Sequence, residues 1–492
     1  MAGELKFLAF DLGAESGRAV LGLLGDGRLR LEETHRFPNI GVAVGESLQW
    51  DVLRLFSEMK QGLRLAVQEH GKDIAGIGVD TWGVDFGLLG PNDVLLENPH
   101  CYRDSRTDGM MEEALTIVPR EEIYEQTGIQ FMPINTIYQL FCLARKNRWM
   151  LESAQTLLMM GDFFNFWFTG VKVCEFSDAT TTQCYNPRTK DWARPLLDRL
   201  DIPNHFLPEI VPPGTVMGNI RKSVSEEVGA GEIPLIAPAT HDTGCAVAAV
   251  PATGKSHVYI SSGTWSLMGV ESSTPIINEK ARKLNFTNEG GVCNTFRVLR
   301  NIMGLWLVQE SKRTWANAGR DFSYAELTDM AAAAEPFRTI IDPDDVLFLK
   351  PGDMPSRIRE YCKRTKQPVP EDEGSVVRTA LDGLALKYRW VLEGLEMLTG
   401  QNLGPIHMVG GGIQNTLLCQ LAANTTGRQV IAGPVEATAI GNILMQALGL
   451  GRIGSLEECR EIVRKSFDLV TYDPVPDSRI EEAYARFKAL IG

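Results

Sequence analysis

The chain has 492 residues, more than one hydrophobic core usually supports, so its length predicts two to four domains. Its 44% hydrophobic and 23% charged residues are typical of an ordinary globular protein and argue against long disordered stretches. The net charge of −13 opposes attraction to nucleic acid or to an anionic membrane, so any phosphate site has to be built locally.

Nine cysteines are scattered along the chain without the C-x-x-C spacing of a zinc or redox site, which predicts reduced thiols. No apolar run approaches the roughly 18 residues of a membrane-spanning helix, and residues 7–10 are too few for the core of a signal peptide. We therefore expect a cytoplasmic protein, a monomer or small homo-oligomer, whose partners are small molecules.

The first elements form an antiparallel sheet. Residues 7–24, FLAFDLGAESGRAVLGLL, predict two apolar strands joined by a polar glycine turn. Residues 25–27, Gly-Asp-Gly, turn the chain into a third strand around residues 28–36, where leucines alternate with charged residues.

A helix and a parallel strand follow. Residues 50–69 carry apolar side chains at helical spacing, and Gly71 is placed to end the helix. Residues 74–80, IAGIGVD, then predict a buried strand. The order strand, strand, strand, helix, strand indicates a ribonuclease H-like α/β unit, with ligands expected where strands end.

The middle of the chain contains an expected insertion and a domain boundary. Residues 120–168 alternate apolar and polar residues at helical periods and predict a helical insertion on the first domain. Residues 234–250, PLIAPATHDTGCAVAAV, predict an apolar strand that enters a helix of small residues. We place the boundary shortly afterwards, which gives domains 1–250 and 251–492.

The second half repeats the pattern of the first. Residues 257–271, HVYISSGTWSLMGVE, predict another strand, glycine turn and strand. Residues 376–398 predict a long amphipathic helix, residues 406–409 a strand before a glycine turn, and a helix begins at about Asn415. The repetition predicts two similar α/β domains facing each other across a cleft.

Two glycine turns are candidate phosphate sites. Asp11 ends the first strand before the turn GAESGR, where a carboxylate can hold hydrated Mg²⁺ while backbone N–H groups hold phosphate. A tight hairpin with a solvated aspartate is the alternative, but Thr264 in the equivalent turn SSGTWS favours the phosphate interpretation. Residues 410–415, GGGIQN, nearly match a dinucleotide-binding pattern and favour close approach of a nucleotide over a plain turn. Residues 254–256, Gly-Lys-Ser, lack the upstream glycine and the following helix of a Walker A loop.

Three polar segments carry further chemistry. Residues 78–86, GVDTWGVDF, bring together the carboxylates, aromatic ring and glycine that bind polyols, although a capped loop is the alternative. Residues 102–106, YRDSR, form a second polar cluster or a surface loop of salt bridges. Asp242 in ATHDTG is placed to accept a hydroxyl proton, although an aspartate at the head of a helix is more often an N-cap.

Over nearly the whole chain these motifs resemble, in the same order, those of the FGGY carbohydrate kinases, in the superfamily of sugar kinases, actin and Hsp70. The matching segments are DLGAESGR, GVDTWGVDF, YRDSRT, TGIQF, NTIYQL, THDT, SSGTWSLMG, TNEGG, NIMGLW, VGGGIQNTLL and AGPVEATAIGN. The resemblance implies two ribonuclease H-like (actin-like ATPase) domains, ATP and Mg²⁺, and transfer of the γ-phosphoryl group to the 1-hydroxyl of L-rhamnulose. Residues 133–139, PINTIYQ, replace a segment with Lys and Trp in broader members, which favours rhamnulose over glycerol or xylulose.

The resemblance also implies roles for particular residues, with Asp242 as the catalytic base. The resemblance implies sugar binding by Gly83, His241, Asp242 and Thr243, and the polyol cluster itself adds Trp82 and Asp85 as candidates. The ATP-binding positions are Ala14, Glu15, Ser16, Gly17, Arg18, Thr264, Asn301, Gln309 and Gly411. The metal ligands are Asp11, through water, and as a further candidate Asp242.

Two positions depart from the family pattern. Glu15 stands where a small residue is expected, and an acid near phosphates weakens ATP binding unless it points to solvent. A disulfide implied at Cys362 is disfavoured because Thr379 stands where its partner is expected.

Two alternative functions remain open. The chain could phosphorylate another ketose such as L-fuculose, or it could be a non-catalytic actin-like regulator that binds ATP. A regulator needs neither a base nor a sugar cluster, whereas this chain has candidates for both.

Overall fold

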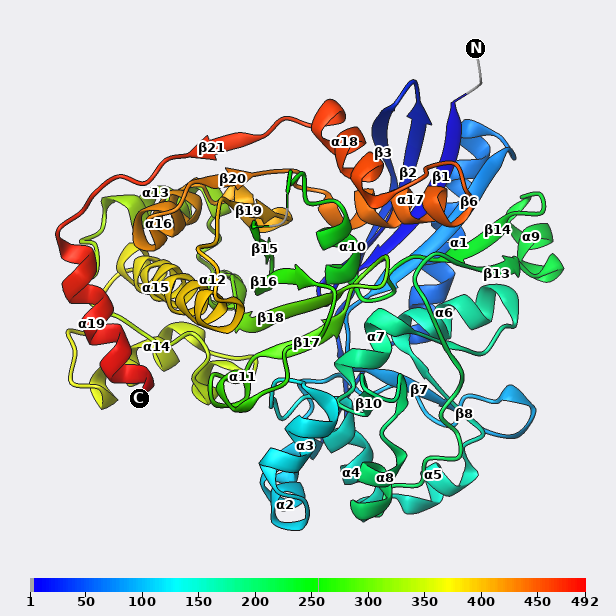
Figure 1. Ribbon diagram of the computed structural model, residues 1–492, viewed down its shortest axis with the longest axis horizontal. Helices are drawn as coiled ribbons and strands as arrows, with labels where there is room; N and C mark the ends of the chain where they lie inside the picture. The colour runs from blue at the N-terminus through cyan, green and yellow to red at the C-terminus, as the bar shows by residue number, and fades with distance from the viewer. Residues whose placement is uncertain (1–3, 255) are drawn as a thin grey trace. The chain divides into compact units, whose positions relative to one another are not determined.

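The computed structural model describes residues 4–254 and 256–492 and divides into two compact units (Figure 1). Unit 1 comprises Met1–Ala249, Glu271–Val298 and Ala437–Phe467, and unit 2 comprises Val250–Val270, Leu299–Glu436 and Asp468–Gly492. The first change of unit falls where the sequence places the domain boundary. The expected division at 250/251 nevertheless differs from the structure, because two later segments return to unit 1. The middle residue of the excluded Walker-like segment 254–256 lies outside the described residues.

Unit 1 is built on a six-stranded sheet with the order β13-β14-β6-β1-β2-β3. These strands are β1 (Leu5–Leu12), β2 (Ser16–Gly25), β3 (Arg28–Pro38), β6 (Ile74–Thr81), β13 (Thr215–Asn219) and β14 (Pro234–Ala237). The predicted antiparallel start is confirmed: β1 pairs with β2 and β2 with β3, and the β2–β3 turn places Asp26 and Gly27 at positive φ. β1 also pairs in parallel with β6, so the carboxyl ends of these two strands lie together.

Helices cover both faces of this sheet. Helix α1 (Val52–His70), which the apolar spacing predicted, packs on the face that carries Ala19, because a Cβ at Gly62 would lie 2.5 Å from the Ala19 Cβ. Helix α17 (Ala437–Gly449) lies against the opposite face, where a Cβ at Gly22 would meet Ile443 at 2.6 Å. Ala19 and Gly22 are three residues apart on β2, and positions three apart on a strand face opposite sides of the sheet. The two helices therefore lie on opposite faces, and the sheet is the middle of three layers.

The remaining elements of unit 1 include the predicted helical region, which also contains strand β8, paired antiparallel with β7 from earlier in the chain. The helices are α2 (Met110–Ile117), α3 (Arg120–Thr127), α4 (Thr136–Lys146), α5 (Arg148–Ser153), α6 (Met160–Thr169), α7 (Phe176–Thr181), α8 (Arg194–Arg199), α9 (Lys222–Val228), α10 (Asp242–Ala248), α11 (Glu279–Lys283) and α18 (Leu456–Ser466). The strands are β4 (Val42–Val44), β5 (Ser47–Gln49), β7 (Phe86–Leu89), β8 (Thr156–Met159), β9 (Cys174–Glu175), β10 (Tyr185–Asn186), β11 (Asp191–Trp192), β12 (Ile210–Val211) and β17 (Thr287–Gly290).

Unit 2 is built on six consecutive strands of the second, seven-stranded sheet, in the order β18-β16-β15-β19-β20-β21; the seventh strand is β17. Its strands are β15 (Val258–Ser262), β16 (Trp265–Ser272), β18 (Phe296–Met303), β19 (Ile406–Val409), β20 (Val430–Ala432) and β21 (Val470–Tyr472), of which β16 and β18 extend into segments of unit 1. Its helices are α12 (Trp306–Asn317), α13 (Tyr324–Ala333), α14 (Met354–Arg364), α15 (Glu373–Thr399), α16 (Thr416–Thr426) and α19 (Arg479–Ile491). As in unit 1, an antiparallel hairpin pairs in parallel with a later strand, here β15 with β19.

Two observations bear on cysteine chemistry and membrane association. All nine cysteines lie within the described residues and are free, and Cys362 is buried without a disulfide partner, in line with the substitution at Thr379. Within residues 4–254 and 256–492, no helix combines the length and the apolar character that a membrane span requires.

Candidate active site

The segment Thr240–Thr243 joins β14 to α10 and is fixed by contacts from three other elements of unit 1, β6, β9 and α7. The Thr81 N–H, at the end of β6, donates to the Thr240 carbonyl oxygen at 2.8 Å. The buried Glu175 carboxylate accepts from the Thr240 N–H at 2.8 Å and from its hydroxyl at 3.0 Å. Ser177 Oγ accepts from the His241 N–H at 3.1 Å. These bonds hold the backbone that presents the expected base.

Asp242 is the first residue of α10, and the N-cap position belongs to His241, so the alternative interpretation of Asp242 as an N-cap does not hold. Its Oδ1 accepts from the Thr243 N–H at 2.5 Å and the Thr243 hydroxyl at 3.1 Å. Burial, followed by the charge of Asp11, raises the pKa of Asp242 to about 7. A carboxylate with this pKa is well matched to accept a proton near neutral pH.

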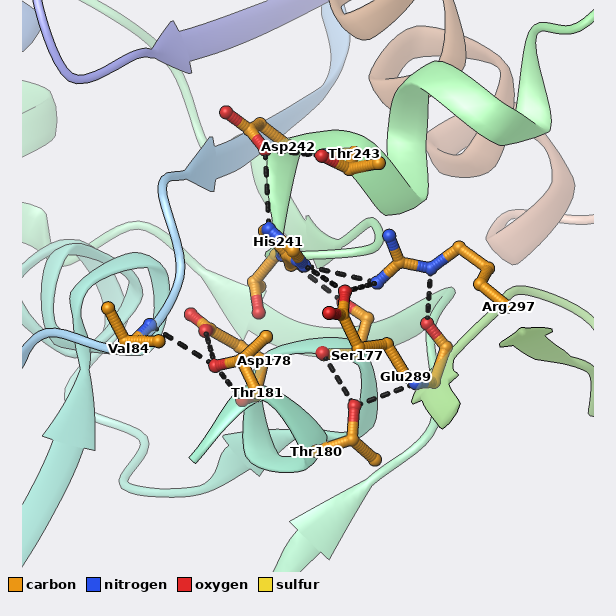
Figure 2. A network of polar contacts seen from close by, with 12 residues as sticks. Val84, Ser177, Asp178, Thr180, Thr181, His241, Asp242, Thr243, Glu289 and Arg297 are labelled. Atoms are coloured by element: carbon orange, nitrogen blue, oxygen red, sulfur yellow. Dashed lines mark hydrogen bonds and ion pairs between the residues drawn. The ribbon is translucent and has the colours of Figure 1, made fainter. Parts of the chain in front are cut away.

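His241 lies between Asp242 and a buried ion pair (Figure 2). Its Nε2 is 3.5 Å from Asp242 Oδ1, and its Nδ1 accepts from Arg297 Nη2 at 3.1 Å. Glu289 Oε2 is 3.4 Å from Arg297 Nη2 and 3.5 Å from His241 Nδ1. Burial and the Arg297 charge lower the pKa of His241 well below its ordinary value, so the imidazole is neutral.

A second group of carboxylates lies where β1 and β6 end. Asp11 and Asp80 stand opposite each other in the parallel pairing of these strands. Arg18 Nη2 is 2.5 Å from Asp11 Oδ2, and Asn442 Nδ2 donates to Asp80 Oδ2 at 2.6 Å. Burial and the charge of Asp11 raise the pKa of Asp80 well above its ordinary value. The contribution of Asp11 shows that the two carboxylates lie close enough to repel each other, an interaction that a bound cation would weaken.

The first glycine turn is tied to the loop after β3. The Asn39 N–H donates to the Glu15 carbonyl oxygen at 2.9 Å, and the Asn39 side chain donates to the Gly13 carbonyl oxygen at 2.7 Å. Gly17 is required by packing, because a Cβ there would lie 2.2 Å from a Phe37 ring atom. Ala14, Glu15 and Ser16 are partly exposed in this turn.

Gly83 lies at a tight and strained turn after β6. A Cβ at Gly83 would lie 3.1 Å from the Thr181 Cγ2 methyl. The next residue, Val84, has φ of 69°, which is rare for a β-branched residue, and its N–H donates to Thr181 Oγ1 at 3.1 Å. Strain of this kind tends to occur at functional sites, where the surrounding structure maintains it.

Asp85 is fully buried, and protein donors occupy both of its carboxylate oxygens. Oδ2 accepts from the Trp50 indole N–H at 2.7 Å, the Trp82 indole N–H at 3.0 Å and the Tyr102 backbone N–H at 3.0 Å. Oδ1 accepts from Gln139 Nε2 at 3.0 Å. The sequence led us to expect Asp85 to bind sugar hydroxyls, but with this many internal donors we infer that it instead orients Trp82.

The polar cluster of residues 102–106 packs around the same carboxylate and is not a surface loop of salt bridges. Asp104 is 6% exposed, and it accepts from Ser47 Oγ at 3.2 Å and from the Leu48 backbone N–H. Arg106 Nη2 donates to Gln139 Oε1 at 2.6 Å. The cluster therefore supports the wall that contains Trp82, whose ring centroid lies 4.3 Å from that of Trp50.

In unit 2, the turn after β15 packs against two glycine-containing segments. The Thr264 carbonyl oxygen accepts from the N–H groups of Gly304 and Trp306, both at 3.1 Å. A Cβ at Gly412 would lie 2.1 Å from Ser262 Oγ, so glycine is required there, whereas a Cβ at Gly411 would meet nothing within 4 Å. The two sequence-predicted elements, the SSGTWS turn and the GGG turn, are thus brought together within unit 2, with Gly411 on the open side.

The other two unit 2 candidates lie on neighbouring elements. Asn301 is on β18, and Gln309 is on the first turns of α12. Both are partly buried. Gln309 Oε1 is buried without a hydrogen-bond partner in the described structure, which leaves it available to a ligand.

Sequence reasoning did not single out several residues that surround His241 and Asp242. These are Glu175, Ser177, Asp178, Thr181, Glu289 and Arg297. The TNEGG motif contained Glu289, but its polar residues suggested no particular partner. The other five carry no local signal, because their contacts join segments far apart in the sequence.

Comparison with known proteins identifies the group to which these features belong. Residues 6–249 match the N-terminal domain, and residues 258–450 the C-terminal domain, of the FGGY family of carbohydrate kinases. A rhamnulokinase of Bacteroides thetaiotaomicron is 45% identical over 98% of this chain and 99% of its own length, and one of Oceanobacillus iheyensis is 44% identical over 95% and 98%.

Solved structures with little sequence similarity share the fold. Ligand-bound xylulose kinase from Lactobacillus acidophilus superposes with a TM-score of 0.78 at 18% identity, covering 99% of this chain and 96% of that one. Plasmodium falciparum glycerol kinase with ADP gives 0.78 at 14% identity, covering 99% and 98%. The mixed α/β, actin-like architecture is therefore confirmed. Because the two domain models together match most of its residues, this chain belongs to the FGGY family of carbohydrate kinases.

Proposed function

We propose that this protein transfers the γ-phosphoryl group of ATP to the 1-hydroxyl of L-rhamnulose, giving L-rhamnulose 1-phosphate. The substrate assignment is supported by relatives that are named rhamnulokinase, share 40–45% identity and match over almost their full length. The observation that carries the chemistry is the environment of Asp242, a carboxylate with a pKa of about 7 at the head of α10.

Asp242 serves as the general base in this proposal. Thr243 holds Oδ1 by two hydrogen bonds, so Oδ2 is the oxygen that receives the sugar hydroxyl proton. Phosphoryl transfer proceeds through a loose transition state, in which alignment of the attacking oxygen matters more than its basicity. The rigid attachment of Thr240 and His241 to Glu175 and Ser177 supplies that alignment.

The sugar is bound by the surrounding residues of unit 1. Gly83 permits close approach of the substrate, Trp82 contributes to the wall that Asp85 orients, and His241 and Thr243 flank the base. His241 is neutral, so it can form a hydrogen bond to a sugar oxygen without placing a positive charge beside Asp242.

The residues at the ends of β1 and β6 fit a magnesium ion. Mg²⁺ retains most of its water and usually binds only one or two carboxylates together with phosphate oxygens. Asp11 is suited to hold it through water, with Asp242 as a second candidate. After burial, the charge of Asp11 is the next cause that raises the pKa of Asp80 and of Asp242, so an ion beside Asp11 would act on all three carboxylates. When bound, the ion supplies charge neutralisation for the phosphate oxygens.

We assign the two glycine turns to ATP, with the turn of residues 14–18 in unit 1 and Thr264 and Gly411 in unit 2. The open space at Gly411 allows close approach of a nucleotide, and the unpartnered Gln309 Oε1, on α12 after Asn301, is an acceptor for a ligand donor. The Arg18 guanidinium pairs with Asp11, so it contributes to the charge balance of the site as well.

The test is a coupled assay of kcat/KM for ATP-dependent phosphorylation of L-rhamnulose, L-fuculose, L-ribulose, D-xylulose and glycerol. We expect a clear preference for L-rhamnulose. Highest efficiency on L-fuculose would replace the proposed substrate while keeping the reaction class. ATP binding without phosphorylation of any of the five would favour the non-catalytic regulator.

A further inference from the structure

The contact between Arg297 and His241 determines which nitrogen of the imidazole carries its proton. A guanidinium group has only donors, so Arg297 Nη2, at 3.1 Å, requires a lone pair on His241 Nδ1. A protonated imidazole carries an N–H on both nitrogens and offers Arg297 no lone pair, so this contact requires a neutral ring whose single proton is on Nε2. Nε2 is the nitrogen on the Asp242 side, 3.5 Å from Oδ1.

The guanidinium group is itself held rigidly. Arg297 is fully buried, its Nε donates to the Gly290 carbonyl oxygen at 2.8 Å, and the Gly290 N–H donates to Thr180 Oγ1 at 2.7 Å. Glu289, whose side chain is 4% exposed, balances the charge with Oε2 at 3.4 Å from Nη2 (Figure 2). A buried cation with this many contacts keeps one orientation.

Glu289 alone would favour the opposite protonation state. Its Oε2 lies 3.5 Å from His241 Nδ1, and a carboxylate only accepts hydrogen bonds. Without the guanidinium, the carboxylate would attract the imidazole proton to Nδ1. The two neighbours of Nδ1 therefore have opposing effects, and Arg297, which is closer, prevails.

We propose that Arg297 is a positioning residue, which holds His241 in the neutral tautomer with its proton on Nε2. This rests on the proposed function, in which His241 faces the sugar. The Nε2–H then donates to a lone pair of the reacting hydroxyl, and the hydroxyl proton is directed to Asp242. The other tautomer would present a lone pair at Nε2, which would compete with Asp242 for that proton.

Selective ¹⁵N labelling of histidine rings tests this proposal in the free protein. The chain has seven histidines, and the His241→Asn variant identifies the signal of interest. We expect an unprotonated Nδ1 in the wild type, a protonated Nδ1 in Arg297→Met, and an unchanged unprotonated Nδ1 in the matched control Glu289→Gln, which keeps the arginine. A protonated Nδ1 in the wild type, or an unprotonated Nδ1 in Arg297→Met, would overturn the proposal.

A double variant covers the case in which Arg297→Met does not fold, because that change removes the positive charge that faces the buried Glu289 carboxylate. Glu289→Gln/Arg297→Met removes both charges, and we expect it to show both tautomers. Retention of the Nε2–H form alone would show that something other than Arg297 selects the tautomer.

Kinetics distinguish positioning from general stability. For folded Arg297→Met we expect kcat/KM for L-rhamnulose to fall about tenfold or more, the effect of one misplaced hydrogen bond, with KM for ATP unchanged. An equal loss for both substrates would point to a purely structural role. If the wild type shows the Nε2–H tautomer but is inactive, the proposed function is contradicted and the tautomer assignment stands. If the wild type is active but Nδ1 is protonated, the tautomer assignment is contradicted and the proposed function stands.

Discussion

Replacing Asp242 by Asn should reduce turnover, because the general base is lost. It should also stabilise the free protein, because the ionised carboxylate is buried. In the folded protein the pKa of Asp242 rises from 3.8 to about 7. Since one pKa unit corresponds to about 1.4 kcal/mol, ionising Asp242 costs about 4 kcal/mol more in the folded protein than in the unfolded chain. The side chain is 30% exposed, so water screens part of that cost, and we expect about 2–4 kcal/mol.

The sign gives a specific pH profile. Because the folded pKa is raised, the native state binds more protons than the unfolded state between about pH 4 and pH 7, and stability falls as pH rises through that window. The asparagine side chain of the Asp242→Asn variant does not ionise, and its oxygen can still accept from Thr243. The variant's gain in free energy of unfolding should therefore be near zero at about pH 4, grow to its full value by about pH 7 and then level off.

Two assays check this prediction. Thermal unfolding of both proteins without ligands, from pH 5 to pH 8.5, should show a Tm difference that widens toward neutral pH. Turnover of Asp242→Asn should fall by roughly 10²- to 10⁴-fold, the range for loss of a general base. Asp382→Asn, a buried carboxylate of α15 with a pKa of about 6, is the control and should keep its turnover. Near-normal turnover in Asp242→Asn, or a variant that is less stable at pH 8, would refute the reasoning.

Three further substitutions test other parts of the site. Gly83→Ala places a methyl group 3.1 Å from Thr181 Cγ2 and should raise KM for the sugar about tenfold. Adding Thr181→Ser, which removes the Cγ2 methyl, should restore part of the loss. An unchanged KM in Gly83→Ala would remove Gly83 from the sugar site. Asp85→Asn replaces an acceptor of four hydrogen bonds by a group with one acceptor oxygen, so calorimetry should show a loss of about 2–4 kcal/mol, and an unchanged Tm would contradict the orienting role. A Cβ at Gly411 would meet no protein atom within 4 Å, so Gly411→Ala should leave Tm unchanged while raising KM for ATP about tenfold. The control Gly454→Ala, also outside the positive-φ region, should change neither Tm nor KM. An unchanged KM for ATP in Gly411→Ala would argue against nucleotide contact there.

Local patterns predicted the elements that carry the motifs. The first hairpin, the helix that became α1 and the strand that became β6 follow from turn residues and apolar periodicity, both of which act over a few residues. The same holds for α15, whose residues 373–399 include the whole predicted amphipathic stretch. In the helical region, β8 was not predicted, because its four residues, Thr-Leu-Leu-Met, are too few to show a period of two.

The division into units was only partly predictable. Helix α17 covers one face of the unit 1 sheet although it comes late in the chain, and a pattern of small and apolar residues does not name the sheet on which it packs. The same limit applies to Asp85, which reads as a sugar ligand in GVDTWGVDF. Its four donors come from Trp50, Trp82, Tyr102 and Gln139, two of which lie outside the motif and its neighbouring cluster.

The sequence by itself determined the glycine turns, the order of strands and helices, and the residue types available for phosphoryl transfer, because each depends on neighbours within a few positions. Only the tertiary structure decided the protonation of the site. The pKa of Asp242 depends on burial and on Asp11, and that of His241 on burial and on Arg297, which follows it by 56 positions. Electrostatic interactions act through space between groups that folding brings together, so residue order alone does not reveal them.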